Sequence, residues 1–409
     1  MRSGILKNPL QVVSWALYDF ANTIFSMNIV SLYFALWLTK EHGGKDIHYG
    51  IVYSASMAAV IIFAPLLGRL ADLRSWRRLF LILSTLACVI TTAMIGVLDR
   101  LDWGLILFFF ANAGYQLALV FYDSLLPSIA TPPEYGKVSG FGVALGYAGS
   151  IAGIAMVSPF VHAGGQVLRH HAFVPTAVLF LLFSLPCFLW VREKKTASPE
   201  WKGSLWRQSL KAVRKNPGVF PYLVTMFLVQ NAVNTVILFM GVYSAEVGGF
   251  TQAKLNIFFI VATTVALITA YLQGRFVDRW GPRIVFRWVL WIWLIALLLA
   301  AMSPGQMGLW LAGCLIGAGL GGLWTSSRPL LLTLIPNEEP ATFFGFNVLT
   351  GRFAALAGPL VWGLIVWFLE PAGVLRYRIA VSVLAVFILA GLFSMRGIPE
   401  RHRYPPSAP

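Results

Sequence analysis

Long apolar runs alternate with short polar segments over almost the whole chain. Each run is about 18 residues or longer, which as a helix is enough to cross a bilayer core of roughly 30 Å. Inside hydrocarbon the backbone polar groups must pair within the segment itself, so the pattern predicts helices and no strands. The twelve predicted spans are 11–39, 49–71, 78–98, 103–129, 137–162, 172–191, 219–246, 254–275, 283–302, 306–334, 341–369 and 374–396.

Composition excludes a soluble domain. Of the 409 residues, 58% are hydrophobic and only 11% are charged, and the mean hydropathy is +0.74. A soluble domain carries about 25% charged residues. We therefore expect an all-α, multi-pass protein of the plasma (inner) membrane, in contact with the lipid bilayer. Cys88, Cys187 and Cys314 lie in apolar runs at unrelated spacings, which favours small core residues over a disulfide or a metal site.

The net charge of +15 is spread over short loops and is not gathered in one domain, which argues against nucleic-acid binding. Most lysines and arginines fall in alternate loops, counted from the N-terminus, as the positive-inside rule predicts. Arg69, Arg77 and Arg78 lie in one such loop, and the segment 192–215 is another. Both termini are therefore expected in the cytoplasm.

One basic turn occurs twice and indicates two similar halves. Gly68–Arg78 joins two apolar runs in the first half, and Gly274–Arg283 does the same in the second. Internal repeats are common in transporters. The predicted organisation is two pseudo-symmetric six-helix bundles with a linker and a tail. Its parts are an N-terminal bundle (1–191), a cytoplasmic linker (192–218), a C-terminal bundle (219–396) and a disordered tail (397–409).

The linker also contains a helical pattern. Apolar residues recur at helical spacing among basic ones, which predicts an amphipathic helix lying on the cytoplasmic leaflet. These apolar positions are Trp201, Leu205, Trp206, Leu210 and Val213.

The repeated turn resembles the loop between helices two and three of the major facilitator superfamily, written G-x-x-x-D-R-x-G-x-R. The second copy fits, whereas the first has Leu73 in place of arginine and one extra residue before its arginine pair. The resemblance implies loops that latch the outward-facing state, and a carboxylate suits the N-terminus of the helix that follows. The loop residues concerned are Gly68, Asp72, Arg77, Arg78, Gly274, Asp278, Arg279 and Arg283.

Several stretches resemble one branch of that superfamily, the vacuolar-effluxer-like family, which includes autophagy-linked amino-acid effluxers of fungi. They include Trp15–Asn22, Phe121–Pro127 and Phe343–Asn347. The resemblance implies a transporter of two six-helix bundles that works by alternating access. One departure from this family matters, and a signature of drug antiporters is also missing. Asn231 stands where the family usually has an acid, and Gly149–Gly153 lacks the proline of the drug-antiporter signature, which weighs against multidrug export.

Four charged residues lie inside apolar runs, namely Asp19, Asp123, Arg328 and Arg352. A charge at mid-bilayer costs at least ~2.5–3.5 kcal/mol, so such residues face a cavity or a partner. Asp123 and Arg328 lie at similar depths and at matching positions of the repeat. We expect them to form an ion pair between the bundles that closes the inner gate. The alternative is that each is satisfied inside its own bundle.

Asp19 and Arg352 come from opposite halves and are expected to face a central cavity. A zwitterionic amino acid would place its ammonium near Asp19 and its carboxylate on Arg352, where bidentate hydrogen bonding is strong. Two alternatives stay open: Asp19 exchanges protons under the influence of Arg352, or Arg352 only binds backbone carbonyls. Further polar or aromatic residues share helix faces and are cavity candidates, with inter-helix hydrogen bonding as the alternative. They are Asn22, Asn112, Gln116, Gln230, Asn231, Asn234 and Trp324.

The sequence predicts a secondary transporter that exports a small polar solute such as an amino acid. No phosphate-binding loop of the G-x-x-x-x-G-K-[ST] type is present, so we expect no nucleotide or other cofactor, a monomer, and protons as a candidate coupling ion. Gly317–Gly322 satisfies G-x-G-x-x-G but lies inside a predicted membrane helix, which favours close helix packing. An exporter of amphiphilic, lipid-like or drug-like compounds and a non-transporting receptor or regulator are the alternatives. An enzyme is not expected, because no nucleophile–base or metal constellation is visible.

Overall fold

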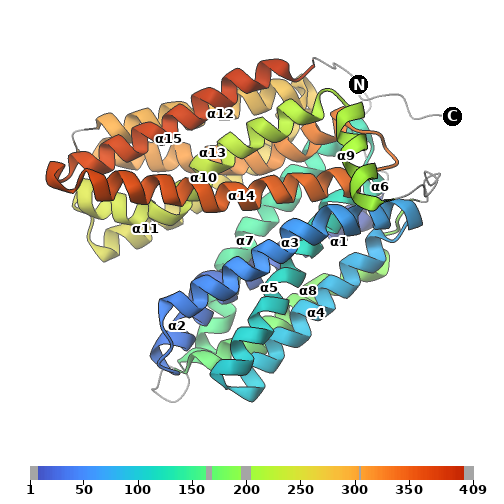
Figure 1. Ribbon diagram of the computed structural model, residues 1–409, viewed down its shortest axis with the longest axis horizontal. Helices are drawn as coiled ribbons and strands as arrows, with labels where there is room; N and C mark the ends of the chain where they lie inside the picture. Colours follow the sequence, from blue (N-terminus) through green and yellow to red (C-terminus); the bar gives the residue numbers. More distant parts are fainter. Residues whose placement is uncertain (1–7, 163–167, 195–203, 304, 400–409) are drawn as a thin grey trace. The chain divides into compact units, whose positions relative to one another are not determined.

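A computed structural model of the chain describes residues 8–162, 168–194, 204–303 and 305–399 (Figure 1). These residues form helices joined by short connections, and no strand occurs among them. The predicted tail, 397–409, and the linker positions 195–203 fall largely outside the described residues.

Among the described residues, twelve helices are long and apolar enough to cross a membrane, which confirms the predicted number of spans. In the first, α1 (Pro9–Phe25), a π-helix η1 (Ser26–Tyr33) and α2 (Phe34–Lys40) follow one another without a break. The other spans of the first half are built from α3 (Asp46–Arg74), α4 (Arg77–Leu98), α5 (Leu101–Ser124) with the short α6 (Leu126–Ile129), α7 (Tyr135–Val161), and the 3-10 turn η4 (Arg169–Ala172) with α8 (Phe173–Trp190).

The linker helix α9 (Leu205–Lys215) is followed by the six spans of the second half. They are α10 (Val219–Gly248), α11 (Gln252–Trp280), α12 (Pro282–Met302), α13 (Gln306–Leu334), α14 (Pro340–Phe368) and α15 (Leu375–Ser394). Short 3-10 turns precede α7 (η2, Pro132–Glu134), follow α14 (η5, Glu370–Ala372) and follow α15 (η6, Met395–Gly397).

The two copies of the repeated turn reverse the chain differently. In the second copy Gly281 has φ 88°, which glycine adopts without steric cost, and Pro282 begins α12 with its φ already fixed. In the first copy Ser75 takes a left-handed conformation with φ 54°, and Trp76 follows before Arg77 begins α4. The extra residue of the first copy therefore lies in a longer turn.

The chain forms two compact units. Unit 1 consists of residues 1–134, 145–209 and 337–345, and its helices pack chiefly as α4 on α5 and α8, α1 on α8, and α3 on α5. Unit 2 consists of 135–144, 210–336 and 346–409, with α13 on α11 and α12, and α15 on α10 and α12. Two short segments, 337–345 and 135–144, thus group with the unit formed mainly by the other half of the sequence.

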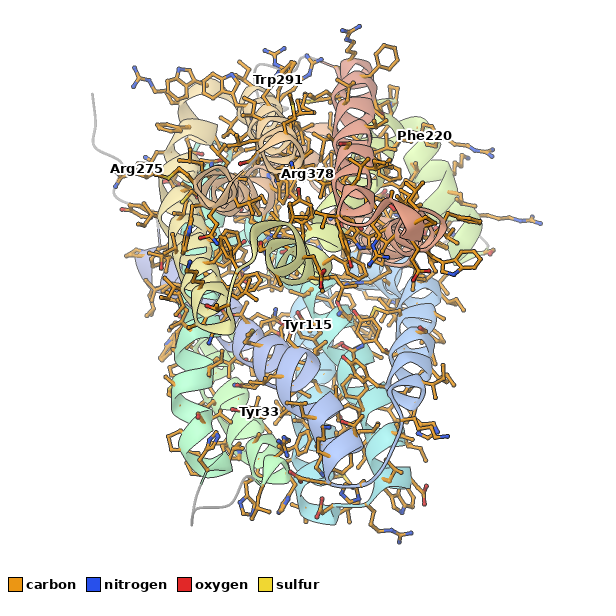
Figure 2. All side chains as sticks on the ribbon, turned by 90° about the vertical axis from the view of Figure 1, so that its left-hand side faces the viewer. Tyr33, Tyr115, Phe220, Arg275, Trp291 and Arg378 are labelled. Carbon is orange, nitrogen blue, oxygen red and sulfur yellow. The ribbon has the colours of Figure 1, made fainter. Side chains whose placement is uncertain are left out.

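Large apolar side chains are exposed along the helices of both units, as expected of a surface that faces lipid. In unit 2, Phe220 and Trp291 point outward from α10 and α12 (Figure 2). Val97 and Phe110 are exposed in the same way in unit 1.

Glycines bring several helices into close contact. A methyl group at Gly313, Gly317 or Gly321 of α13 would overlap Phe258 or backbone of α11, so these glycines allow the two helices to pack directly. The packing interpretation of the Gly317–Gly322 run is confirmed, because the run forms a helix–helix contact and does not follow a strand.

Candidate functional site

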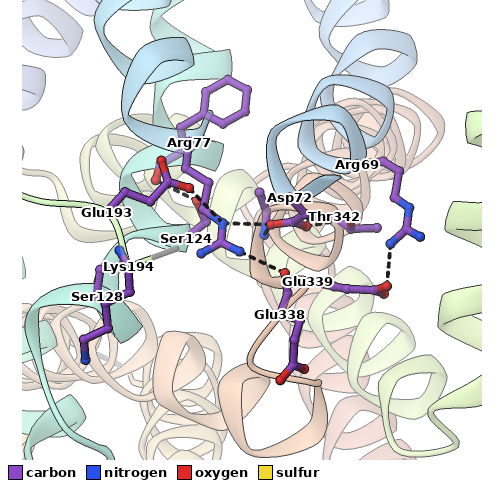
Figure 3. Close-up of polar contacts among 12 residues, drawn as sticks. Arg69, Asp72, Arg77, Ser124, Ser128, Glu193, Lys194, Glu338, Glu339 and Thr342 are labelled. Carbon is purple, nitrogen blue, oxygen red and sulfur yellow. Dashed lines mark hydrogen bonds and ion pairs between the residues drawn. The ribbon is translucent and has the colours of Figure 1, made fainter. Parts of the chain in front are cut away.

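The first copy of the repeated turn holds a buried polar network (Figure 3). At its centre the fully buried Asp72 carboxylate accepts hydrogen bonds from the backbone N–H groups of Ala341 (3.1 Å) and Thr342 (2.7 Å) and from the Thr342 hydroxyl (2.7 Å). Those amides belong to the first turn of α14, where backbone donors have no partner inside the helix. The negative charge of Asp72 also interacts favourably with the positive end of the α14 dipole.

Arg77 connects this carboxylate to two further segments. Its Nε donates to Asp72 at 2.8 Å and its Nη2 donates to the carbonyl of Glu338 at 2.9 Å. The Glu193 carboxylate lies 3.7 Å from Arg77 Nε and accepts the backbone N–H of Arg78 at 3.1 Å. Burial raises the pKa of Glu193, although the Arg78 amide and the Arg77 charge act in the opposite direction. A buried guanidinium is thereby surrounded by acceptors, as its burial requires.

Two other basic residues fix the edges of the network. Arg69 forms an ion pair with Glu339 at 2.5 Å and donates to Gln208 Oε1 of α9 at 3.2 Å. Arg78 donates through Nε to the carbonyl of Phe188 at 3.1 Å, near the end of α8. The network therefore joins the ends of α3, α4, α8 and α9 to the segment before α14.

The second copy repeats the central contact in unit 2. Asp278 accepts the backbone N–H groups of Gly136 (2.7 Å) and Lys137 (3.0 Å), in the first turn of α7. The glycine of each motif explains the close approach: a methyl group at Gly68 would overlap the Ala341 carbonyl, and one at Gly274 would overlap the Gly136 carbonyl. The arginines of the second copy have different surroundings from those of the first. Arg279 stacks on Trp280 at 5.3 Å, and Arg283 is half-buried.

The helices that these carboxylates bind are not the predicted ones. From the sequence, Asp72 and Asp278 were expected at the N-terminus of the helix that follows directly, namely α4 and α12. They bind the first turns of α14 and α7 instead. The prediction was wrong because α4 and α12 begin immediately after tight turns, where other segments lie closer to the carboxylates.

The cavity candidates of unit 1 are all buried. On α1 the Asp19 carboxylate packs against Gly146 of α7, and Thr23 donates its hydroxyl to the Gly146 carbonyl at 2.6 Å. On α5, Asn112 donates to the Ser56 hydroxyl of α3 at 2.8 Å, so this amide does form the inter-helix bond named as its alternative role. The buried candidates are Asp19, Asn22, Asn112, Gln116 and Asp123.

The candidates of unit 2 divide by exposure. Gln230 and Asn231 are buried, and Asn231 donates to the carbonyl of Phe227 in its own helix at 2.7 Å. The Gln230 amide packs directly against Gly351, the neighbour of Arg352. The partly exposed candidates are Asn234, Trp324, Arg328 and Arg352. The expected pairs Asp123–Arg328 and Asp19–Arg352 join residues of different units, so both stay predictions.

The π-helix of the first span carries a polar residue that the sequence analysis did not single out. Asn28 is fully buried, and within the described residues neither its Nδ2 nor its Oδ1 has a hydrogen-bond partner. Its amide lies beside Gly153, whose added Cβ would be 3.2 Å from Nδ2. π-helical segments are rare and often occur at functional sites. The only sequence signal was one amide within an apolar run.

A second cluster that was missed lies where α2, η4 and the α4–α5 connection meet. Asp99 accepts the indole N–H of Trp37 at 2.8 Å and lies 2.9 Å from His42 Nε2. Burial raises the pKa of Asp99, but the hydrogen bonds from Trp37 and His42 outweigh it, so that pKa lies below its ordinary value. His170, in the turn η4, also belongs to this cluster, because it is only partly exposed and contacts a carboxylate.

That carboxylate belongs to Glu41. Its Oε1 accepts the backbone N–H of Arg169 at 2.6 Å, and its Oε2 lies 3.4 Å from His170 Nδ1. His170 Nδ1 is also 4.0 Å from Asp99 Oδ2. Across the part of the chain that the structure describes, no group of three or more His, Cys, Asp or Glu side chains is placed to hold a metal ion. The hydrogen bonds and ion pairs of this cluster join α2, η4 and the α4–α5 connection, and we call it an ionic clamp.

Twelve membrane helices, two compact units and a repeated loop that binds helix N-termini define a polytopic membrane transporter. The chain belongs to the Major Facilitator Superfamily, whose family profile matches residues 19–359. It is 25% identical to the uncharacterized MFS-type transporter YxiO of Bacillus subtilis (strain 168), covering 95% of this chain and 94% of the relative. It is 27% identical to the multidrug resistance protein MdtG of Dickeya zeae (strain Ech586), covering 85% and 86%.

Among solved structures, the chain is similar in fold to the human organic anion transporter MFSD10. The TM-score is 0.74 at 13% identity, over 95% of this chain and 99% of that one. The two-bundle architecture expected from the sequence is thereby shown. Membership of the Major Facilitator Superfamily makes the protein a transporter.

Proposed function

We propose that this transporter exports amphiphilic, drug-like organic compounds by alternating access, driven by an ion gradient. The observation that carries the proposal is that relatives of the chain, MdtG of Dickeya zeae and of Escherichia coli among them, are named multidrug resistance proteins. This substrate class replaces the amino acid favoured by the sequence. The missing proline in Gly149–Gly153 counts for less than relatives that align over most of the chain.

A groove on unit 1 supports an amphiphilic substrate. It has a volume of about 410 Å³ and lies between α3 and α5. Its walls are apolar apart from one imidazole, which suits a mostly apolar compound with a polar end. The lining residues are His48, Ile51, Val52, Ala55, Leu105, Ile106 and Phe109.

Buried polar residues supply the contacts that orient such a compound. In this proposal Asp19 is the proton-exchanging carboxylate, and loading it with a proton changes its attraction for a cationic substrate. The amides and aromatic side chain supply neutral contacts, and Arg352 acts on the charge of Asp19. The proposed substrate residues are Asp19, Asn22, Asn112, Gln116, Gln230, Asn231, Asn234, Trp324 and Arg352.

The conformational cycle is proposed to use the charged pairs. Asp123 and Arg328 close the inner gate, and the contacts of Asp72 with α14 and of Asp278 with α7 hold the outward-facing state. Each contact must break once per cycle, so its hydrogen bonds contribute to the barrier between the two states. The one-sided distribution of basic loops supports a plasma (inner) membrane protein with both termini in the cytoplasm.

Purified protein in liposomes tests the proposal. The substrates are ethidium, as a lipophilic cation, and a panel of labelled amino acids, each with and without a pH gradient. We expect gradient-dependent ethidium transport that Asp19→Asn abolishes and that Asp102→Asn, at an exposed acid of α5, leaves unchanged. Transport of amino acids without ethidium would contradict the proposal, and transport of neither would show that the substrate belongs to another class of compound.

Amino-acid export stays the second candidate. The stretches Trp15–Asn22 and Phe343–Asn347, which resemble vacuolar effluxers, favour it. The opposite charges of Asp19 and Arg352 would suit the ammonium and carboxylate of a zwitterion. The same liposome experiment decides between the two, because it offers ethidium and amino acids to the same protein.

A further inference from the structure

The linker helix α9 has two different faces. Ser209 is fully buried, and Gln208, Ala212 and Val213 are partly buried, so one face packs on the protein. The opposite face is exposed and basic. Its residues follow at helical spacing and are Arg207, Leu210, Lys211, Arg214 and Lys215.

This exposed face is a continuous basic stripe. Four cations at positions i, i+4, i+7 and i+8 share one side of a helix. The helix contains no acidic residue. Leu210, with 47% of its surface exposed, lies among the cations and adds an apolar contact. A surface with several clustered cations and no compensating acid is suited to bind several phosphates at once.

The chain holds this stripe close to the membrane. Only Asn216, Pro217 and Gly218 separate Lys215 from Val219, the first residue of the α10 span. Such a connection reaches at most about 14 Å. The basic end of α9 therefore lies within reach of the lipid headgroups that surround the start of α10.

The packed face of α9 touches the polar network of unit 1. Gln208 Oε1 accepts a hydrogen bond from Arg69, and the same guanidinium pairs with Glu339 just before α14. Any displacement of α9 moves one of the two partners of Arg69. Because Arg69 is buried, bulk water does not replace the hydrogen bond to Gln208 when that bond is lost. Losing it therefore costs free energy.

We infer that the basic stripe of α9 binds the headgroups of anionic phospholipids and thereby sets the strength of the Arg69–Glu339 ion pair. Headgroup binding holds α9 with Gln208 against Arg69, which orients the guanidinium toward Glu339. Without anionic lipid, α9 leaves this position, and Arg69 of the ion pair loses its hydrogen bond to Gln208. The transporter then depends on the lipid composition of its own membrane. The binding step is independent of the proposed function, and only the transport readout depends on it.

Lipid binding is tested with full-length protein in detergent. Phosphatidylglycerol is titrated in, and native mass spectrometry counts the molecules retained, with phosphatidylcholine as the reference lipid. The variant is Lys211→Gln with Arg214→Gln, and the matched control is Arg275→Gln with Arg287→Gln, two exposed arginines at the end of α11 and the start of α12. Each juxtamembrane charge contributes about fivefold to anionic lipid affinity, so the α9 variant should bind at least tenfold more weakly. The control removes the same number of charges from a different site, away from the α9 stripe, so it should bind clearly more tightly than the α9 variant.

The coupling step is tested in vesicles of phosphatidylcholine with or without one third phosphatidylglycerol. Wild-type ethidium transport should rise with the anionic lipid, and this response should be lost in the α9 variant. Gln208→Leu keeps the stripe but removes the acceptor, so it should retain lipid and yet lose the response.

The inference is overturned if the α9 variant and the control retain phosphatidylglycerol equally, in which case the stripe faces a partner other than lipid. A Gln208→Leu protein that still responds to the lipid overturns the coupling through Arg69. If no ethidium is transported under any condition, the proposed function fails while the mass spectra still decide the binding step.

Discussion

Trp15 donates its indole N–H to the carbonyl of Tyr122 at 3.0 Å, at the residue that directly precedes Asp123. The second half repeats the arrangement: the Tyr222 hydroxyl donates to the carbonyl of Ser327 at 3.2 Å, directly before Arg328. In each unit an aromatic donor on the first long helix thus bonds to the backbone carbonyl directly before a charged residue of a membrane helix. The repeat preserves this relationship although the donor and the charge both differ.

Removing only the hydrogen-bond donor of Trp15 or Tyr222 should weaken the positioning of the neighbouring charged residue without unfolding the protein. Trp15→Phe keeps a ring that can stack on Tyr122 but loses the bond to the Tyr122 carbonyl. Tyr222→Phe keeps its ring but loses the hydroxyl contacts with the Ser327 carbonyl and with Asn347 Oδ1. We expect each to lower the free energy of unfolding by about 1 kcal/mol and to reduce the transport rate. The measurements are unfolding in detergent and transport in liposomes. Trp103→Phe, at a 47% exposed indole, is the control, and an equal effect there would refute the assignment.

The motif glycines should tolerate no side chain. In Gly68→Ala the new methyl group overlaps the Ala341 carbonyl, so α14 must shift its first turn away from Asp72. We expect a loss of about 1–3 kcal/mol of stability, as for other overpacked contacts. The control is Gly50→Ala in the same helix, where no atom lies within 4 Å of the new group. Alanine there should be neutral or stabilising by up to about 1 kcal/mol in thermal unfolding. Equal midpoints for both variants would contradict this account.

Much of the fold could be predicted from the sequence, because the residues of each span are enough to identify it as a membrane helix. An apolar run such as Pro282–Met302 needs no distant partner to be identified as a membrane helix. The duplication of the basic turn could also be predicted, because Gly68 and Gly274 begin two similar motifs in the two halves.

The partners of the polar residues could not be predicted in the same way. Asp72 and Thr342 are 270 residues apart in sequence, and no local pattern specifies that they meet. The same holds for Glu41 and Arg169, which are 128 residues apart. Asn28 of the π-helix lies beside Gly153 of α7, which is far along the chain. The sequence pattern therefore identified several polar residues that form buried contacts. Tertiary packing determines which of these residues contact one another.

The pair Asp72–Arg77 should show strong coupling. Breaking a buried ion pair from one side leaves a buried charge without its counter-ion and typically costs about 3–5 kcal/mol. Asp72→Asn also turns an amide N–H₂ toward the donors of α14. We expect each of Asp72→Asn and Arg77→Gln to be strongly destabilising, and the double variant to fall short of their sum by more than about 1 kcal/mol.

Unfolding in mixed micelles of the four proteins of this cycle gives the coupling energy. Arg74→Gln, at an exposed arginine of the same turn, is the control and should change stability by less than about 0.5 kcal/mol. Strict additivity of the two substitutions would show that Asp72 and Arg77 act independently, against the 2.8 Å contact.

The clamp around Asp99 should make stability fall in acid. The groups that face it are His42, His170 and, one contact further, Glu41 and Arg169. Because the pKa of Asp99 is lower in the folded than in the unfolded state, its carboxylate contributes stability that is fully present above the unfolded pKa of about 3.9 and is lost as the pH falls through the folded value.

Asp99→Asn should therefore lower the thermal unfolding midpoint at neutral pH, and the difference from wild type should close as the pH falls below about 4, where Asp99 itself becomes neutral. The measurement is a series of melts in detergent from neutral to acidic pH. Asp102→Asn, at an exposed acid two helix positions into α5, should follow the wild type throughout. A gap between Asp99→Asn and wild type that stays constant across the whole series would show that Asp99 acts through its shape and not through its charge.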